Sequence, residues 1–471
     1  MLIGGQWRSA GDDRKIAVTD PASEKLLAEV ESATVQDAMD AVSAAEAAFA
    51  AWSSKPPRER AEVLRRAYQL MIDQLDRIAT VIVLESGKAY SEAQAEVKYA
   101  AEFLRWNSEE AVRAEGSFGQ APGGGNRLLV MRQPVGVCLF VTPWNFPAAM
   151  ATRKIGPALA AGCTVVLKPA TETPLTALLM GEIFLEAGVT PGVVNVVPSP
   201  ASNGIVAAML ADPRVRKLSF TGSTEVGRTL LTQAAQNIVK CSMELGGNAP
   251  FIVLGDADLD VAVQAAMVAK LRNGGESCTA ANRFLVHEDI ADAFALKFAS
   301  AMKSVRIGPG IDPANQLGPM INAKTRNKIE ELVEDAISEG AKALTGARRL
   351  PGKGYFYEPT VLTQVPRAAR VLREEIFGPV APISTFSSTQ EAVEMANDTE
   401  FGLVSFICSR DLSKALNLAE RLECGMVGIN RGVVSDPAAP FGGWKQSGVG
   451  REGGHEGLLD YLETKYIAVT W

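Results

Sequence analysis

The sequence predicts an α/β protein with two doubly wound parallel sheets. From residue 135 onward, apolar runs of strand length recur about every 25 residues, and helix-like segments lie between them. A second series of the same kind begins at residue 250. Strands that alternate with helices in this way are typical of a parallel sheet with helices on both faces.

The chain is long enough for several buried cores. It has 471 residues, of which 47% are hydrophobic and 21% are charged, and at ~100–200 residues per domain this length predicts roughly two to four domains. The 47 basic and 54 acidic residues give a net charge of −7. Because the chain is mildly acidic and has no basic run, we expect neither nucleic acid nor an anionic membrane as a partner.

Cysteine and histidine usage argues against a metal site and against a disulfide framework. The 6 cysteines are scattered along the chain, and there are only 2 histidines. No apolar stretch approaches the ~18 residues that span a bilayer, and the N-terminus lacks the basic start and apolar run of a signal peptide. We therefore expect no bound metal, no membrane association and a reduced, cytoplasmic location.

The first 115 residues are expected to be mostly helical. Apolar residues recur at helical spacing from Ala38 to Trp52, and Pro56–Pro57 begins a longer helix that runs to about Leu84. A glycine-rich passage follows Glu115, and the alternating sequence after it predicts an exposed strand or hairpin arm over 116–134.

Two α/β units follow this arm, the first ending near Gly247 and the second near residue 446. Strands of the first unit are expected at 135–143, 164–169, 193–198 and 215–222. Strands of the second unit are expected at 250–254, 283–287, 380–386, 403–409 and 425–430, with a helix over 258–272. The C-terminal tail has the pattern of a strand with no obvious partner, and such strands often complete a neighbour's sheet.

The usual dinucleotide fingerprint is missing from the first unit, since no GxGxxG follows a strand there. The nearest feature is FTGSTEVGR at 220–228, which combines a strand end, a tight turn and a helix start. Its backbone amides and helix dipole suit a pyrophosphate. The same residues also suit an ordinary turn with a Ser/Thr N-cap, so this feature alone does not decide.

Two residues are candidates for chemistry. Cys278 lies in GGESCTAANR, a loop of small and polar residues that is unlike the surroundings of a core cysteine, and a nucleophilic thiol needs such access. Glu244 follows an apolar strand and precedes two glycines. Partial burial there raises a carboxyl pKa toward the range of a general base, although a solvated loop carboxylate fits the same sequence.

Seven motifs taken together resemble the aldehyde dehydrogenase superfamily. In order they are VTPWNFP (141–147), KPATETP (168–174), FTGSTEVG (220–227), MELGG (243–247), GESCTAANR (275–283), EEIFGP (374–379) and PFGGWKQSGVGRE (440–452). The resemblance covers essentially the whole chain. It implies an aldehyde dehydrogenase-like fold, with a Rossmann-type cofactor domain that lacks the GxGxxG turn, an α/β catalytic domain and a small β oligomerisation arm.

The resemblance also assigns roles to matching residues. Cys278 is similar to the nucleophile that forms a thiohemiacetal, and Asn145 to the side-chain donor of the oxyanion hole, whose loss typically costs about 100- to 1000-fold in rate. Glu244 is similar to the base that activates water to hydrolyse the thioester. The residues matched to the cofactor site are Thr142, Pro143, Trp144, Asn145, Lys168, Thr171, Gly222, Ser223, Leu245, Glu375 and Phe377.

Within the superfamily the chain most resembles the succinate-semialdehyde dehydrogenases, which hold the far carboxylate of the substrate with two arginines and a serine. The matching positions are Arg153, Arg272 and Ser435. Arginine suits this task because its planar fork pairs with a carboxylate through two hydrogen bonds. The same residues would accept glutarate semialdehyde or 2-oxoglutarate semialdehyde, and a broad-range aldehyde specificity is a further alternative.

Two positions refine the expectation. Relatives that are strict for NAD often carry Glu where this chain has Thr171, so we expect NADP to be accepted, while the preference between NADP and NAD stays open because Glu172 is adjacent. Some relatives carry a second cysteine two residues after the nucleophile, as part of a redox switch. Here that position is Ala280, so we expect no such switch.

The resemblance implies a domain division and a homo-oligomer. Residues 1–115 and 135–247 are expected to bind the cofactor, 248–446 to carry catalysis, and 116–134 with 447–471 to pair protomers into a homodimer or homotetramer. The expected substrate is a small-molecule aldehyde. A coenzyme A-acylating enzyme is disfavoured because such relatives lack the glutamate base, and a non-catalytic structural relative is disfavoured because nucleophile and base are both intact.

Overall fold

The computed structural model describes residues 1–470, and it contains the two predicted parallel sheets. The first sheet has 8 strands with parallel pairing through its centre. In spatial order they are β2 (Gln6–Trp7), β1 (Leu2–Ile3), β9 (Val194–Val196), β8 (Thr164–Lys168), β7 (Val137–Val141), β10 (Val215–Thr221), β11 (Lys240–Glu244) and β21 (Gly448–Val449).

Helices cover both faces of this sheet because its central strands are apolar on both sides. Along β7, Cys138 and Phe140 face one core, whereas Leu139 and Val141 face the other, as the two-residue period of a strand requires. The helices are α1 (Val35–Ser53), α2 (Pro57–Asp73), α3 (Leu75–Ser86), α4 (Tyr90–Glu110), α5 (Pro147–Ala161), α6 (Pro174–Glu186), α7 (Ser202–Ala211) and α8 (Thr224–Ala234).

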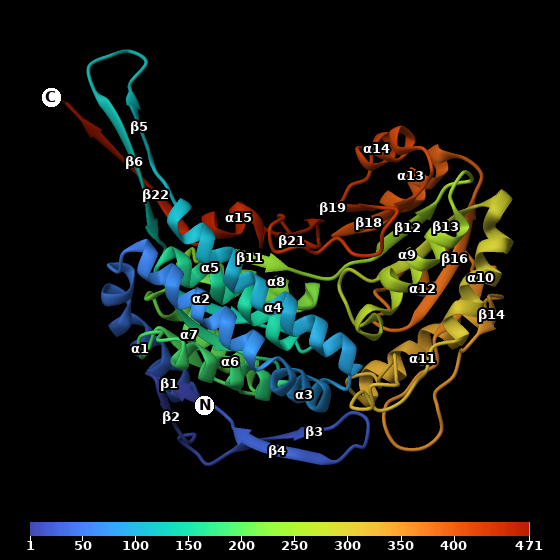
Figure 1. The fold of residues 1–471 in the computed structure, drawn as a ribbon, viewed down its shortest axis with the longest axis horizontal. Coiled ribbons are helices and arrows are strands. Elements are labelled where there is room, and N and C mark those ends of the chain that lie inside the picture. The colour runs from blue at the N-terminus through green and yellow to red at the C-terminus, as the bar shows by residue number, and fades with distance from the viewer. Residues whose placement is uncertain (471) are drawn as a thin grey trace.

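The second sheet has 7 strands and forms the other lobe of the molecule (Figure 1). Its order is β14 (Lys342–Thr345), β15 (Thr360–Thr363), β16 (Val380–Phe386), β13 (Ala281–His287), β12 (Ala249–Val253), β18 (Val404–Cys408) and β19 (Met426–Ile429). Its helices are α9 (Leu259–Leu271), α10 (Ala291–Lys303), α11 (Ala323–Ser338), α12 (Arg370–Arg373), α13 (Thr389–Asn397) and α14 (Leu412–Ala419).

A three-stranded antiparallel arm projects away from both lobes (Figure 1). It consists of β5 (Ser117–Gln120), β6 (Arg127–Pro134) and β22 (Leu462–Val469), with β6 in the middle. The C-terminal strand therefore has a partner in its own chain, contrary to the expectation of a tail without one, because all 8 residues of β22 pair with β6.

The segment between the second unit and the arm also differs from the expected division at residue 447. Strand β21 pairs with β11 and so extends the first sheet, and α15 (Gly454–Leu459) contributes to the core of the same lobe. Two short pairings complete the strands: β3 (Lys15–Thr19) with β4 (Leu26–Glu31), and β17 (Phe401–Gly402) with β20 (Trp444–Lys445).

The N-terminal region departs from the expected helices in two ways. Strands β1 to β4 precede α1, in a region that was expected to be mostly helical. The long helix expected to reach Leu84 is broken at Gln74, which ends α2 and precedes α3. Among the described residues, no helix is long and apolar enough to cross a membrane.

Candidate active site

The polar residues identified in the first unit lie at one edge of its sheet. The register places Val141 opposite Lys168 and Phe220, and Thr221 opposite Glu244. Because these strands are parallel, the residues that follow them share the carboxyl edge, where ligands bind in open α/β sheets. The turn after β10 brings Ser223 to the start of α8, and its hydroxyl caps that helix.

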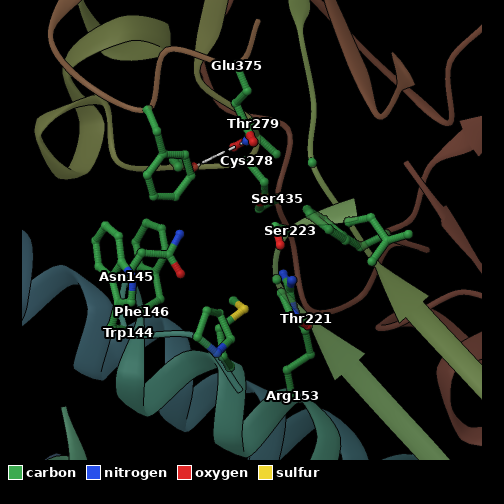
Figure 2. A pocket seen from close by; sticks show the side chains of 18 of the residues that line it. Trp144, Asn145, Phe146, Arg153, Thr221, Ser223, Cys278, Thr279, Glu375 and Ser435 are labelled. Carbon is green, nitrogen blue, oxygen red and sulfur yellow. Dashed lines mark hydrogen bonds between the residues drawn. The ribbon is translucent and has the colours of Figure 1, made fainter. Parts of the chain in front are cut away.

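A cavity of about 260 Å³ lies between this edge and the second unit. Figure 2 shows residues from both units around it: Trp144, Asn145 and Phe146 precede α5, whereas Cys278 and Glu375 come from loops that precede β13 and β16. The predicted site residues that line it are Pro143, Trp144, Asn145, Arg153, Gly222, Ser223, Leu245, Arg272, Cys278, Glu375, Phe377 and Ser435.

Four predicted residues do not line this cavity: Thr142, Lys168, Thr171 and Glu244. Thr142 and Lys168 are joined through the backbone, since the Thr142 amide donates to the Lys168 carbonyl at 3.2 Å. Lys168 is buried, and burial lowers the pKa of its ammonium to about 8 against the opposing charge of Glu172. Within the described chain, this ammonium has no hydrogen bond or ion pair with a protein group.

The thiol of Cys278 is neutral in this environment. Burial, followed by the charge of Glu375, raises its pKa to about 12, although Arg153 and Arg272 oppose that shift. A thiol of this kind becomes nucleophilic only when its proton is removed as it attacks. The site therefore requires a base nearby.

Glu244 ends β11 and is close enough to Cys278 for its charge to raise the pKa of that thiol. It is 3% exposed, and burial together with the charge of Glu452 holds the pKa of its carboxyl well above the usual range. Its Oε2 atom is buried and has no hydrogen-bond partner among the described residues. A buried carboxyl that lacks a partner is costly unless a ligand or water engages it.

Asn145 is held against the loop that carries Cys278. It is buried, and its side-chain Nδ2 donates to the carbonyl of Glu276 at 3.0 Å. An amide nitrogen carries two N–H groups, so one remains for a ligand in the cavity. This arrangement holds a hydrogen-bond donor near Cys278, as stabilisation of a developing oxyanion requires.

Glu375 reaches the cavity from the second unit. Its Oε1 accepts a hydrogen bond from the backbone N–H of Gly247 at 3.2 Å, and burial raises the pKa of its carboxyl to about 7. A Cβ added at Gly246 would lie 3.0 Å from Glu375 Oε2. Glycine at that position therefore lets the carboxylate and the strand end approach each other closely.

The two predicted arginines differ in their surroundings. Arg153 is 2% exposed and its Nε lies 3.6 Å from Glu452 Oε2, while its Nη2 donates to the hydroxyl of Tyr99. Its guanidinium lies 4.0 Å from the ring centroid of Phe441. Burial opposes its charge, but Tyr99 and Glu452 together raise the pKa of Arg153.

The guanidinium of Arg272 has fewer polar protein partners than that of Arg153. Its guanidinium lies 5.1 Å from the ring centroid of Phe146 and 5.6 Å from that of Tyr99. In the part of the chain that the structure describes, it makes no hydrogen bond or ion pair to a protein group. Ser435 lines the same cavity, and its hydroxyl likewise has no protein partner among those residues.

Sequence reasoning missed several contributors. Tyr99 and Phe441 line the cavity, and the buried Lys154 forms an ion pair with Glu452, which lies beside Arg153. Glu452 is the last residue of the motif PFGGWKQSGVGRE (440–452), so the sequence identified its position but not its partners. Tyr99 lies within the helix α4, where nothing in the local pattern distinguishes it from an ordinary helical aromatic.

The carboxyl edge of the first sheet fits a dinucleotide. It presents a buried lysine without a protein partner, a turn that leads into a helix, and the buried Oγ1 of Thr221, which has no partner among the described residues. Glu375 supplies a carboxylate at the junction with Cys278. Hydrogen-bond donors and acceptors suited to a ribose and a phosphate are thus available along the carboxyl edge of the first sheet.

The fold and the site together define a class: an α/β protein of the dinucleotide-binding type with a cysteine in the cavity between its two lobes. Comparison with known proteins makes this specific. The chain matches the aldehyde dehydrogenase family over residues 7–467 and belongs to that family. It is an oxidoreductase that acts on small-molecule aldehydes with NAD or NADP as hydride acceptor, and the predicted fold is confirmed.

Three relatives illustrate the match. A succinate-semialdehyde dehydrogenase of Paenarthrobacter nicotinovorans is 54% identical over 444 residues, which cover 94% of this chain and 99% of that protein. A glutarate-semialdehyde dehydrogenase of Pseudomonas putida is 47% identical, covering 99% of this chain and 97% of that protein. The crystal structure of an NADP-dependent enzyme of Escherichia coli has a TM-score of 0.98 at 46% identity, covering 100% and 98% of the two chains.

Proposed function

We propose that this enzyme oxidises succinate semialdehyde to succinate, with reduction of NAD or NADP. The observation that carries the proposal is the unpartnered guanidinium of Arg272 in the same cavity as Cys278. A cation without a protein partner, next to a nucleophile for aldehydes, favours an aldehyde that carries an anion. The names of the relatives from Paenarthrobacter nicotinovorans and Pseudomonas putida agree with a semialdehyde substrate.

The chemistry begins with the thiol of Cys278. Its sulfur attacks the aldehyde carbon, a C–S bond forms, the thiol proton passes to a base, and the carbonyl oxygen becomes the oxyanion of a thiohemiacetal. The side-chain N–H of Asn145 and the backbone N–H of Cys278 stabilise that oxygen. A nicotinamide held by Glu375 would supply the acceptor for the hydride that leaves this carbon, and Cys278 would then carry a thioester.

Hydrolysis of the thioester requires an activated water. Glu244 is the proposed base, because its buried Oε2 has no hydrogen-bond partner among the described residues and can accept a proton from a bound water. Removal of a proton from water generates the attack on the thioester carbon, the C–S bond breaks, and the carboxylic acid leaves. The buried Lys154–Glu452 pair near Glu244 adds to the charges that set the protonation of this carboxyl.

Arg153, Arg272 and Ser435 form the proposed carboxylate site. Arg272 and Ser435 offer hydrogen bonds that no described protein group uses, whereas Arg153 is already oriented by Tyr99 and Glu452. We therefore assign the direct charge-assisted contact chiefly to Arg272. Each such hydrogen bond contributes ~1.5–3 kcal/mol, or about ten- to a hundredfold in rate or affinity.

Glutarate semialdehyde is the second candidate substrate, and the relative from Pseudomonas putida favours it. It ends in the same carboxylate and is longer by one methylene. A hydrophobic pocket discriminates one methylene by only ~1–3 kcal/mol, so both aldehydes are expected to react. The same reasoning extends to 2-oxoglutarate semialdehyde.

The proposed cofactor contacts follow the carboxyl edge of the first sheet. Lys168 lies near the adenosine ribose, Glu375 holds the nicotinamide ribose, and Ser223 begins the helix that faces the pyrophosphate. Thr171 carries no charge that would repel a 2′-phosphate, so NADP is proposed to be accepted alongside NAD. In this proposal residues 1–115 and 135–247 bind the cofactor, and 248–446 carry the nucleophile.

The arm supports a homodimer or homotetramer. A three-stranded sheet that projects from the body has little core of its own, and pairing with a second copy would bury its faces. We also place the enzyme in the cytoplasm, because the six cysteines are free thiols and disulfides are rare in that reducing compartment.

The substrate proposal is tested by comparing kcat/KM for succinate semialdehyde and butanal, an uncharged aldehyde of similar length, at saturating NADP. We expect Arg272→Ala to lower the value for the semialdehyde by about ten- to a hundredfold and to leave butanal nearly unchanged. The matched control is Lys328→Ala, which removes another cation lining the cavity whose Nζ is bound to the carbonyl of Glu375 at 2.7 Å. This control is expected to affect both aldehydes equally. Equal losses on both aldehydes in Arg272→Ala would refute the carboxylate assignment.

A further inference from the structure

A buried ion pair lies just outside the cavity, on two elements that carry none of the proposed catalytic residues. Lys88 lies in the turn between α3 and α4, and Glu96 lies in α4. Their side chains are 5% and 0% exposed, and Lys88 Nζ is 2.5 Å from Glu96 Oε2. Burial of two charges costs several kcal/mol per ion, so such a pair is weak evidence of a stabilising role and points to a geometric one.

Both members of the pair bind the segment that carries Asn145. Lys88 Nζ donates to the backbone carbonyl of Asn145 at 2.7 Å and lies 4.5 Å from the ring centroid of Phe146. Glu96 Oε1 accepts from the backbone N–H groups of Ala148 and Ala149 at 2.9 and 3.3 Å.

Glu96 thereby caps α5 from another helix. The N-cap residue of α5, Phe146, provides no side-chain cap of its own. A carboxylate that accepts from the first free N–H groups of a helix satisfies them and matches the positive end of the helix dipole. The ion pair therefore fixes residues 145–149 at two points, one on each side of Phe146.

The same carbonyl is held from the nucleophile side. Asn273 Nδ2 donates to the Asn145 carbonyl at 2.9 Å and also lies 2.9 Å from the Glu276 carbonyl, which in turn accepts from Asn145 Nδ2. Cys278 is two residues beyond Glu276. The position of the Asn145 amide relative to the thiol is thus set by one connected network of hydrogen bonds.

The turn that carries Lys88 is itself clamped by the second unit. The Tyr90 amide donates to the Gly310 carbonyl at 2.9 Å. A Cβ added at Gly310 would lie 2.0 Å from the Lys88 carbonyl, and one added at Gly318 would lie 1.9 Å from the Gly87 carbonyl. Only glycine allows the two units to approach this closely, so Lys88 is held at their junction.

We propose that Lys88 and Glu96 are positioning residues for the oxyanion donor. They hold the backbone of Asn145 so that its free side-chain N–H meets the oxygen of the attacked aldehyde. An oxyanion donor must be held within ~0.5 Å of its productive position. This inference rests on the proposed role of Asn145, and the pair acts through that residue without touching substrate.

A double-mutant cycle tests this dependence. Hydride transfer is followed as NADPH formation in a single turnover, with Lys88→Met, Asn145→Ala and the double variant. We expect Asn145→Ala to slow the step by about 100- to 1000-fold. We expect Lys88→Met to slow it by about ten- to a hundredfold, with the dissociation constant of NADP unchanged in this variant. In the Asn145→Ala background, Lys88→Met is expected to cost less than about twofold more, because its route of action is already lost.

Lys217→Met is the matched control. It removes another fully buried ammonium, which lies 3.6 Å from Asp460 Oδ2 and donates to Ser242. Among the described residues, this ammonium has no hydrogen bond, ion pair or ring contact with residues 145–149. Its effect on hydride transfer, whatever its size, is expected to be the same factor in both backgrounds. If Lys88→Met does not fold, Glu96→Gln takes its place in the cycle, with a smaller loss and the same non-additivity.

The outcomes separate the two proposals. If Asn145→Ala leaves hydride transfer unchanged, the proposed oxyanion role is wrong. If Asn145→Ala slows the step but the Lys88 variant has no effect, or multiplies with Asn145→Ala as Lys217→Met does, the positioning proposal is overturned and the role of Asn145 stands.

Discussion

Burial sets the protonation of the residues around the nucleophile. Cys278 and Glu244 both have pKa values raised chiefly by burial, and each carries a further negative neighbour that adds to the shift. The thiol of Cys278 is therefore protonated before it reacts, and the carboxyl of Glu244 holds its proton more tightly than an exposed glutamate does. Attack on an aldehyde must then be accompanied by transfer of the thiol proton, which couples the reactivity of Cys278 to the groups around it.

Replacement of the nucleophile is the direct test at this scale. We expect Cys278→Ala to abolish NADPH formation from succinate semialdehyde, because no other group can form the C–S bond, while NADP still binds. Turnover is measured by absorbance and binding by fluorescence titration. Cys241→Ala, a thiol on β11 that does not line the cavity, serves as the control and is expected to retain activity. Dehydrogenase activity in the Cys278 variant would remove the nucleophile assignment.

At the scale of elements, the site is a meeting of strand and loop ends. Lys168 ends β8 and Glu244 ends β11 in the first sheet, whereas Cys278 and Glu375 precede β13 and β16 in the second. In each sheet, parallel pairing aligns the strand ends, so residues at corresponding ends share one edge of that sheet whatever their side chains are. The helices α4 and α5 add Tyr99 and Arg153 to the cavity, and the segment before α5 adds Asn145.

Glu375 and Lys168, the two titratable residues proposed to contact the cofactor, predict a pH range in which the affinity for NADP is highest. Burial raises the pKa of Glu375 to about 7, so in its proposed role it is the stronger, charged acceptor for the ribose above that pH. Burial lowers the pKa of Lys168 to about 8, so in its proposed role its ammonium is charged toward the phosphate chiefly below that pH. NADP is therefore expected to bind most tightly between about pH 7 and pH 8, with a dissociation constant that rises on either side.

Two variants test which residue causes the weaker NADP binding at each end of this pH range. Glu375→Gln should remove the weakening on the acid side, and Lys168→Met should remove the weakening on the alkaline side, each at some cost in affinity. Isothermal titration across pH measures both. A profile that keeps its acid limb in Glu375→Gln would show that another group titrates there.

At the scale of the whole molecule, the three-stranded arm has little core of its own. It projects from both lobes (Figure 1). Tyr466, which pairs with Val130, and Met131, which pairs with Lys465, are both exposed on its strands. Such a sheet is marginal alone and stable when another surface covers it. A second copy of the chain provides that surface in the proposed homo-oligomer.

The expected mass tests the arm directly. Light scattering should give at least twice the 50.0 kDa of one chain. Introducing charge on the arm with Tyr466→Asp and Met131→Lys should shift the mass toward one chain, because burial of those charges in an interface is unfavourable. A mass that remains unchanged in this variant would place the interface elsewhere.

Local sequence predicted the central strands of both sheets and most of the site, whereas β1, β2, β14, β15 and β21 were not expected. The apolar runs at 135–143 and 164–169 became β7 and β8, because a buried parallel strand needs a continuous apolar run and that requirement is local. Cys278, Asn145 and Arg272 were identifiable because they lie within or beside motifs, and the structure brings all three to one cavity.

Tertiary structure alone decided which partners these residues have. Nothing local predicts that Glu452 would meet Arg153 and leave Arg272 free, that Tyr99 would enter the cavity, or that β22 would pair with β6. The same holds for the ion pair that holds Asn145. Hydrophobic periodicity reports how a segment folds against its own neighbours, whereas these contacts join segments far apart in sequence, whose proximity exists only once the two sheets have packed.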